Sequence, residues 1–203
     1  MIFKIKIFLL AAIFSFCLPQ FKGLSENNLT SEDSLNLIIN DLLSELNKAP
    51  DFSLYSYTGE LYNLRSLEGK VVLLNFWATW CGPCRMEIPE LNEIQEIYGE
   101  DEFIVLGISI SDTEKALKDF VKLYDVKYPL LYGSPKEIET VLLEYGGIYS
   151  VPTSILINKK GESIFSYPGA ILKSYDRYDG VYTALNNKID KAIKEKYKFP
   201  NGD

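Results

Sequence analysis

Near-continuous apolar runs of strand length alternate along this chain with apolar residues spaced three and four positions apart. The run at Val71–Phe76 predicts a central strand that is covered on both faces, as in a parallel sheet, and the run at Phe103–Ile110 predicts a second apolar strand. Between them, helical spacing predicts a helix that begins near Pro83 and continues to Gly99. Pro89 lies inside this helix, where we expect it to produce a kink.

Shorter elements complete the pattern on both sides of this unit. We expect short strands at 51–54 and 60–62, helices capped at Asp112–Glu114 and starting near Ser134, a strand from Pro152, a hairpin turn at Asn158–Gly161, a strand at 163–167, and a closing helix striped by Val181, Leu185, Ile189 and Ile193. The strand that opens at Pro152 follows a glycine-containing loop, which suits a cis Val151–Pro152 peptide. This order predicts an α/β fold whose central mixed β-sheet is flanked by helices on both faces.

Residues 24–48 form a predicted N-terminal helical extension. Its apolar positions fall on one helical face, and Thr30 or Ser31 is the candidate N-cap. That face serves either to pack on the adjacent domain or to mediate dimerisation or docking. Ala49–Pro50 marks the boundary to a domain at 49–175, because the residue before proline avoids helical geometry. Residues 176–203 are expected to form a C-terminal helix that packs on this domain.

The first 23 residues have the features of a targeting segment. Lys4 and Lys6 precede the uncharged apolar run Ile7–Leu18, which has the length of a signal-peptide core rather than of a membrane span. A buried core helix is the structural alternative. Cleavage as a signal peptide, lipid attachment at Cys17 and retention as a membrane anchor all stay open. Each of the three predicts that the body of the protein lies outside the cytoplasm.

Composition narrows the classes of partner. The 203 residues are 47% hydrophobic and 13% aromatic, which is ample for a packed core, and the net charge is −7. No basic patch stands out that would neutralise phosphates, so we expect no nucleic acid partner. The chain contains no histidine, which excludes a Cys–His nucleophile pair.

Cys81 and Cys84 carry the candidate chemistry. Cys81 lies between a predicted buried strand and the N-terminus of the next predicted helix. The unpaired N–H groups and the dipole at that helix N-terminus stabilise a thiolate. Cys84 follows one turn later, within reach of a mixed disulfide formed at Cys81. A structural disulfide would close too short a loop to constrain the unfolded chain much. A metal site is disfavoured because Cys17 is the only further cysteine and histidine is absent. Thiol–disulfide exchange is therefore the predicted chemistry, with no metal.

The run Trp80-Cys81-Gly82-Pro83-Cys84, preceded by Asn75-Phe76-Trp77-Ala78, resembles the thioredoxin superfamily. Together with Ala49–Phe52, Glu87–Pro89 and Val151–Thr153, it is similar to the TlpA/ResA branch, over residues 49–169. That resemblance implies a thioredoxin-like fold and an extracytoplasmic thiol–disulfide oxidoreductase. Several members of the branch act in cytochrome c biogenesis by reducing apocytochrome cysteines.

The resemblance also implies roles for individual residues. Cys81 would be the attacking thiolate, Cys84 the buried resolving thiol, and their redox-active disulfide would serve in place of any cofactor. Substrate contacts would come from Trp80, Gly82, Pro83, Val151 and Pro152. Pro152 would be the cis proline that faces the cysteines, the alternative being an ordinary turn proline.

Glu87 is the third candidate catalytic residue. Cytoplasmic thioredoxins have a buried aspartate at the position of Asn75, and asparagine cannot transfer protons as that aspartate does. Glu87, three residues after Cys84, lies on the same helical side and would take over this role. The alternative is a solvated carboxylate on the helix surface.

The predicted function is reduction of disulfides in client proteins, with a membrane thiol-transfer protein as electron donor. Two other classes stay open. A peroxiredoxin-like thiol peroxidase would carry a proline and a threonine ahead of its cysteine, but Leu74 stands where the proline belongs. A non-catalytic binding module of the same fold is the second alternative.

Overall fold

The computed structural model describes residues 31–197. The predicted leader at 1–23, with Cys17, lies outside the described residues. The chain divides into two compact units, Met1–Leu42 and Leu43–Asp203. In the part of the chain that the structure describes, no helix is both long enough and apolar enough to cross a membrane.

The predicted N-terminal helical segment is present as α2, Ser31–Asn47. Glu32 and Asp33 lie in its first turn, where negative charge complements the helix dipole. Its large apolar side chains are between 43% and 60% exposed: Leu35, Leu37, Ile38, Ile39, Leu42, Leu43 and Leu46.

The domain after α2 is built on one mixed sheet of seven strands in the order β2-β1-β5-β4-β3-β6-β7. The strands are β1 Ser53–Ser56, β2 Leu61–Asn63, β3 Val71–Trp77, β4 Phe103–Ser109, β5 Leu130–Tyr132, β6 Thr153–Ile157 and β7 Ser163–Pro168. The central strand β3 pairs in parallel with β4 and antiparallel with β6. Because it has a neighbour on each edge and helices over each face, all seven of its residues are buried, as its apolar run predicted.

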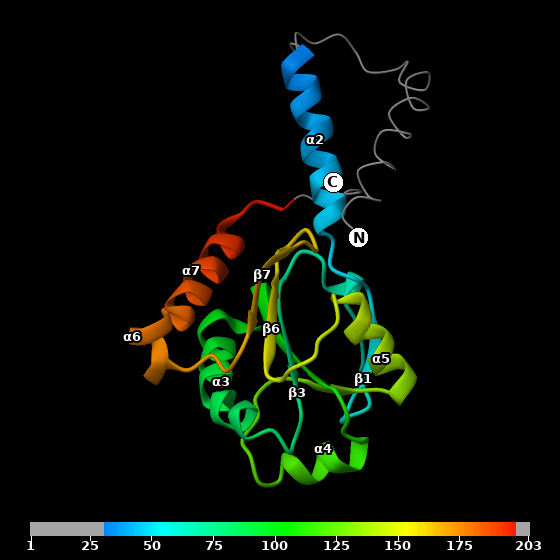
Figure 1. The fold of residues 1–203 in the computed structure, drawn as a ribbon, viewed down its shortest axis with the longest axis vertical. Helices are drawn as coiled ribbons and strands as arrows, with labels where there is room; N and C mark the ends of the chain where they lie inside the picture. The colour runs from blue at the N-terminus through cyan, green and yellow to red at the C-terminus, as the bar shows by residue number, and fades with distance from the viewer. Residues whose placement is uncertain (1–30, 198–203) are drawn as a thin grey trace. The chain divides into compact units, whose positions relative to one another are not determined.

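Helices cover both faces of this sheet, which confirms the predicted fold class (Figure 1). The helices are α3 Gly82–Glu102, α4 Glu114–Phe120, α5 Pro135–Glu144, α6 Asp176–Asp179 and α7 Val181–Lys194, with short 3₁₀ turns at Arg65–Leu67 and Lys173–Tyr175. Residues of alternate parity along β3 point to opposite faces. Leu73 faces the core formed with α3 and α7, and Leu74 faces the core formed with α5.

The element boundaries agree with the sequence pattern except at a few places. The short strand β5 was not predicted, because three residues are too few to show a periodicity. Helix α3 contains Pro89, but its non-helical backbone lies at Gly99, with φ 69°. Glycine adopts this left-handed conformation without steric cost, and Gly99 is the residue at which the sequence pattern ended the predicted helix. The Val151–Pro152 peptide is cis, as predicted.

Candidate redox site

Cys81 is the N-cap residue of α3 and is joined to Cys84 by a disulfide bond. The backbone N–H of Cys84 lies 3.2 Å from Cys81 Sγ, the position that a thiolate would occupy in the reduced protein. Both cysteines are buried, at 4% and 2% exposure. A sulfur held at the positive end of a helix, with a backbone donor aimed at it, has the environment that stabilises the anionic form.

The second wall of the site comes from the loop before β6. Cys81 Sγ lies 3.7 Å from the carbonyl oxygen of Val151, which precedes the cis peptide to Pro152. The two loops meet because Phe76 of β3 pairs with Thr153 of β6. The chain therefore leaves β3 and enters β6 at the same end of the sheet.

Glu87 is fully buried in α3, which overturns the alternative of a solvated surface carboxylate. Its Oε1 accepts a hydrogen bond from Asn75 Nδ2 at 2.8 Å, and its Oε2 accepts one from the backbone N–H of Ile171 at 2.9 Å. Burial raises the pKa of this carboxyl from its ordinary value of 4.5 to about 7, although the two donated hydrogen bonds act in the opposite direction. The side chain thus changes charge near neutral pH.

Asn75 is a polar residue in an otherwise apolar strand, and the structure shows why. Residue 75 shares its side of β3 with Leu73 and Trp77, the side that faces α3. Its amide group donates to Glu87 and, at 3.1 Å, to Ser154 Oγ on the paired strand β6. The amide therefore links β3, β6 and α3 beneath the disulfide-bearing turn.

The remaining predicted site residues lie around the cysteines with different exposures. Trp80 is 63% exposed, and its Nε1 donates to Ser111 Oγ at 3.0 Å. Pro83 is exposed and Gly82 is half-buried in the first turn of α3, whereas Pro152 is buried and Val151 is half-buried. Trp77, by contrast, packs inside the core against Phe120, with ring centroids 5.0 Å apart.

Two contacts of the site escaped the sequence analysis. The Asp112 carboxylate accepts hydrogen bonds from Thr79 N at 2.8 Å and from Thr79 Oγ1 at 2.6 Å, and so fixes the loop before Cys81. The Ile171 N–H group that reaches Glu87 comes from the segment after β7. A backbone donor leaves no signal in a sequence. Asp112, however, stands one residue before the α4 N-cap Thr113, and a carboxylate at such a position is a signal for hydrogen bonds to a neighbouring loop.

A seven-stranded mixed sheet, a disulfide at a helix N-terminus and a cis proline facing it define a thiol–disulfide oxidoreductase of thioredoxin-like fold. Residues 46–163 match the model of the AhpC/TSA family, so the chain belongs to that family. Within the described residues, no group of three or more histidine, cysteine, aspartate or glutamate side chains is placed to hold a metal ion.

Known proteins similar to this chain fall in the same class. The thiol-disulfide oxidoreductase ResA of Bacillus thuringiensis subsp. konkukian is 37% identical over 122 residues, which are 60% of this chain and 68% of that protein. A solved structure described as a putative thiol:disulfide interchange protein DsbE from Chlorobium tepidum aligns with a TM-score of 0.61 and 31% identity, covering 72% of this chain and 96% of that one. The pneumococcal exposed lipoprotein thioredoxin of Streptococcus pneumoniae aligns with a TM-score of 0.56 and 30% identity, covering 68% and 99%.

Proposed function

We propose that this protein reduces disulfides in client proteins outside the cytoplasm, with apocytochrome c as the client class that the ResA resemblance implies. The observation that carries the proposal is the Cys81–Cys84 disulfide at the start of α3, with the Val151 carbonyl 3.7 Å from Cys81 Sγ. An extended client segment that paired with the backbone at Val151 would present its own disulfide to Cys81.

The proposed reaction transfers two electrons from the reduced Cys81 and Cys84 thiols to a client disulfide. The Cys81 thiolate attacks one client sulfur, which forms a mixed disulfide and releases the first client thiolate. Cys84 loses its proton and attacks Cys81 Sγ, which breaks the mixed disulfide and releases the second client thiolate. The protein is left with the Cys81–Cys84 disulfide, and the client gains two electrons and, after taking up two protons, two thiols.

Glu87 is the proposed acceptor of the Cys84 proton. Both residues are buried on the inner side of α3, and burial sets the pKa of Glu87 to about 7, within the range where proton acceptance is useful at neutral pH. Trp80, Gly82, Pro83, Val151 and Pro152 are proposed to contact the client, and no cofactor beyond the cysteine pair is required.

The proposed site of action is the outer side of the cell membrane. The basic-then-apolar segment at 1–23 and the similarity to an exposed lipoprotein thioredoxin support export, with signal cleavage, lipidation at Cys17 and membrane anchoring as the routes. Outside the cytoplasm a dithiol drifts to the disulfide, so a membrane thiol-transfer protein is the proposed electron donor.

Reduction of insulin disulfides with dithiothreitol as electron source tests the activity. We expect turnover by the wild type and none by Cys81→Ser or Cys84→Ser, whereas a non-catalytic binding module would be unaffected by these changes. Redox titration against glutathione tests the direction: a potential as oxidising as about −120 mV would overturn the reductant assignment. Turnover of hydrogen peroxide would favour a thiol peroxidase instead.

The client is identified by trapping. In Cys84→Ala the second step is blocked, so the mixed disulfide at Cys81 should accumulate and mass spectrometry should identify the captured protein. Apocytochrome c among the captured proteins would support the proposed client class.

A further inference from the structure

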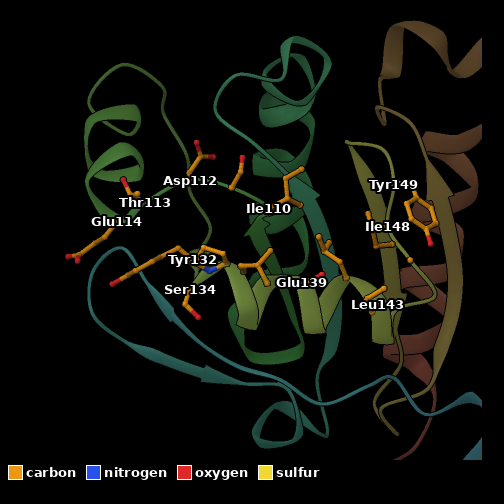
Figure 2. Close-up of a pocket in the computed structure, with 16 residues that line it drawn as sticks. Ile110, Asp112, Thr113, Glu114, Tyr132, Ser134, Glu139, Leu143, Ile148 and Tyr149 are labelled. Carbon is orange, nitrogen blue, oxygen red and sulfur yellow. The ribbon is translucent and has the colours of Figure 1, made fainter.

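A groove of about 710 Å³ lies beside the redox site, on the part of the domain formed by the loop after β4, by α5 and by the segment 147–149. Figure 2 shows Glu114 and Tyr132 near one end of it and Ile148 and Tyr149 near the other. Its floor is mainly apolar, with Ile110, Ile138 and Leu142 among the lining residues. Neither cysteine lines it, so it is distinct from the site where the exchange takes place.

Two lining residues of the groove, Ser111 and Tyr149, connect it to residues beside Cys81. On one side, Ser111 lines the groove and accepts the hydrogen bond from Trp80 Nε1, and Trp80 is the neighbour of Cys81. On the other side, Tyr149 lies two residues before Val151, whose carbonyl oxygen is 3.7 Å from Cys81 Sγ. Lining residues of the groove are therefore next to the residues that surround Cys81, by a hydrogen bond on one side and by two positions of sequence on the other.

The charges along the groove have one sign. Its lining residues include the carboxylates of Asp112, Glu114 and Glu139 and contain no lysine or arginine. Asp112 is engaged by Thr79, and Glu114 is paired with Lys118. The exposed carboxylate of Glu139, in the middle of α5, is therefore the charge best placed to meet a cation.

Exposed apolar side chains stand beside this charge. Tyr149 is 92% exposed and Leu143 is 61% exposed. The Tyr149 ring lies over Gly147: a Cβ atom at that residue, whose φ is +81°, would come within 2.6 Å of the ring. Glycine at 147 therefore lets the ring lie close to the backbone at the end of the groove, where it offers a flat apolar surface.

We propose that this groove binds the segment of the client polypeptide that flanks its disulfide, and that it selects a segment with an apolar side chain and a lysine or arginine. The inference rests on the proposed function, because it names the client chemistry that the same redox site would receive. The apolar side chain packs on Leu143 and Tyr149, and the cation meets Glu139.

The test uses two disulfide-containing peptides of equal length, one with leucine and lysine beside its disulfide and one with leucine and glutamate. Hydroxyethyl disulfide, which has no peptide segment beside its disulfide, reports the chemistry alone. For the lysine peptide we expect Glu139→Lys to raise KM about fivefold with kcat unchanged, since reversing an exposed charge of this kind shifts binding modestly. KM for the glutamate peptide should fall, and Leu143→Ser should raise KM for both peptides.

Glu195→Lys, an equal charge change at an exposed position outside the groove, is the matched control and should alter neither KM. Unchanged KM values in Glu139→Lys and Leu143→Ser, with normal turnover of hydroxyethyl disulfide, would overturn the groove while leaving the proposed function intact. An equal loss with hydroxyethyl disulfide would assign the effect to the cysteines and also overturn it. If KM rises with enzyme concentration and sedimentation shows dimers, the groove is occupied by a second copy of the chain, which would overturn the proposal. Failure of the wild type to reduce hydroxyethyl disulfide would instead refute the proposed function.

Discussion

The side-chain amide of Asn75 donates a hydrogen bond to Glu87 Oε1 across 2.8 Å, and this contact joins the central strand to the helix that carries both cysteines. Both groups that face the Glu87 oxygens are donors, which favours the ionised carboxylate, but burial outweighs them and raises its pKa to about 7. The buried carboxyl of Glu87 therefore has a pKa in the neutral pH range, in which thiol–disulfide exchange takes place.

Glu87 should make stability depend on pH. Its folded pKa of about 7 lies above the ordinary 4.5, so the stability it contributes is fully present below about pH 4.5 and is lost as pH rises through about 7. A shift of this size corresponds to about 3 kcal/mol. Urea unfolding from pH 4 to 8 should show the wild type losing this stability while Glu87→Gln does not. Exposed Glu139→Gln is the control, and parallel curves for wild type and Glu87→Gln would contradict the prediction.

Glu87 should also shape the pH dependence of the thiols. If it accepts the Cys84 proton, the rate of client release should show an inflection near pH 7 that is missing in Glu87→Gln, with the rate at pH 7 reduced about tenfold or more. Stopped-flow kinetics of mixed-disulfide resolution from pH 5 to 9 measure this directly. Superimposable profiles would assign Glu87 a purely structural role.

Replacing Asn75 with aspartate should place two carboxyl groups in hydrogen-bond contact within the core. Two buried carboxyls at this separation share a proton, because both cannot ionise without strong repulsion. We expect Asn75→Asp to lose about 3 kcal/mol of stability at pH 8 and to recover much of it at pH 5. Asn75→Ala, which removes the donor without adding a charge, should show no comparable recovery in the same denaturation series.

Asp112 is expected to position the loop that precedes Cys81. Removing its carboxylate in Asp112→Ala leaves both Thr79 donors without their partner and should cost about 2 kcal/mol in urea unfolding. It should also slow alkylation of reduced Cys81, because the loop loses its fixed geometry. Thr79→Val, which keeps the backbone bond, should show a smaller effect on both measurements. An alkylation rate of Cys81 in Asp112→Ala equal to that of the wild type would show that the Asp112–Thr79 contact does not influence the reactivity of Cys81.

The C-terminal helix should be required for stability. Leu185 of α7 is fully buried in the core shared with α3 and β3, so Leu185→Ala should cost about 3 kcal/mol through lost burial and a residual cavity. Leu123→Ala removes the same side chain at a position that is 82% exposed, and its effect should stay within about 0.5 kcal/mol. Equal midpoints for the two variants in thermal unfolding would contradict this account of the core.

The sequence alone was sufficient for the elements that carry strong patterns. The apolar run at 71–76 and the cysteine pair after it located the centre of the fold and the redox turn, because a strand buried on both faces has few polar positions. For the one polar position in this run, Asn75, the sequence indicated only that it replaces the buried aspartate of cytoplasmic thioredoxins. Its contact with Ser154 depends on strand pairing, which periodicity does not specify.

Features assembled from several segments were beyond sequence reasoning. Spacing placed Glu87 on the cysteine side of the helix but left a solvated position open, and the carboxylate is in fact buried and bonded to the backbone at Ile171. The Asp112–Thr79 contact joins residues 33 positions apart, and the groove draws on three separate stretches of chain. Such proximities arise from the three-dimensional order of strands rather than from any local pattern.

The pairing of Phe76 with Thr153 places the cysteine turn, which follows β3, and the cis-proline loop, which precedes β6, at the same end of the β3–β6 ladder. Asp112 gives the cysteine turn a second anchor through Thr79, but the cis-proline loop enters β6 directly at this pair, so the two parts of the site lose their mutual geometry when β3 and β6 separate. On heating, disulfide-reducing capacity and sheet signal should vanish together at a single midpoint, and the protein should fail as a catalyst all at once.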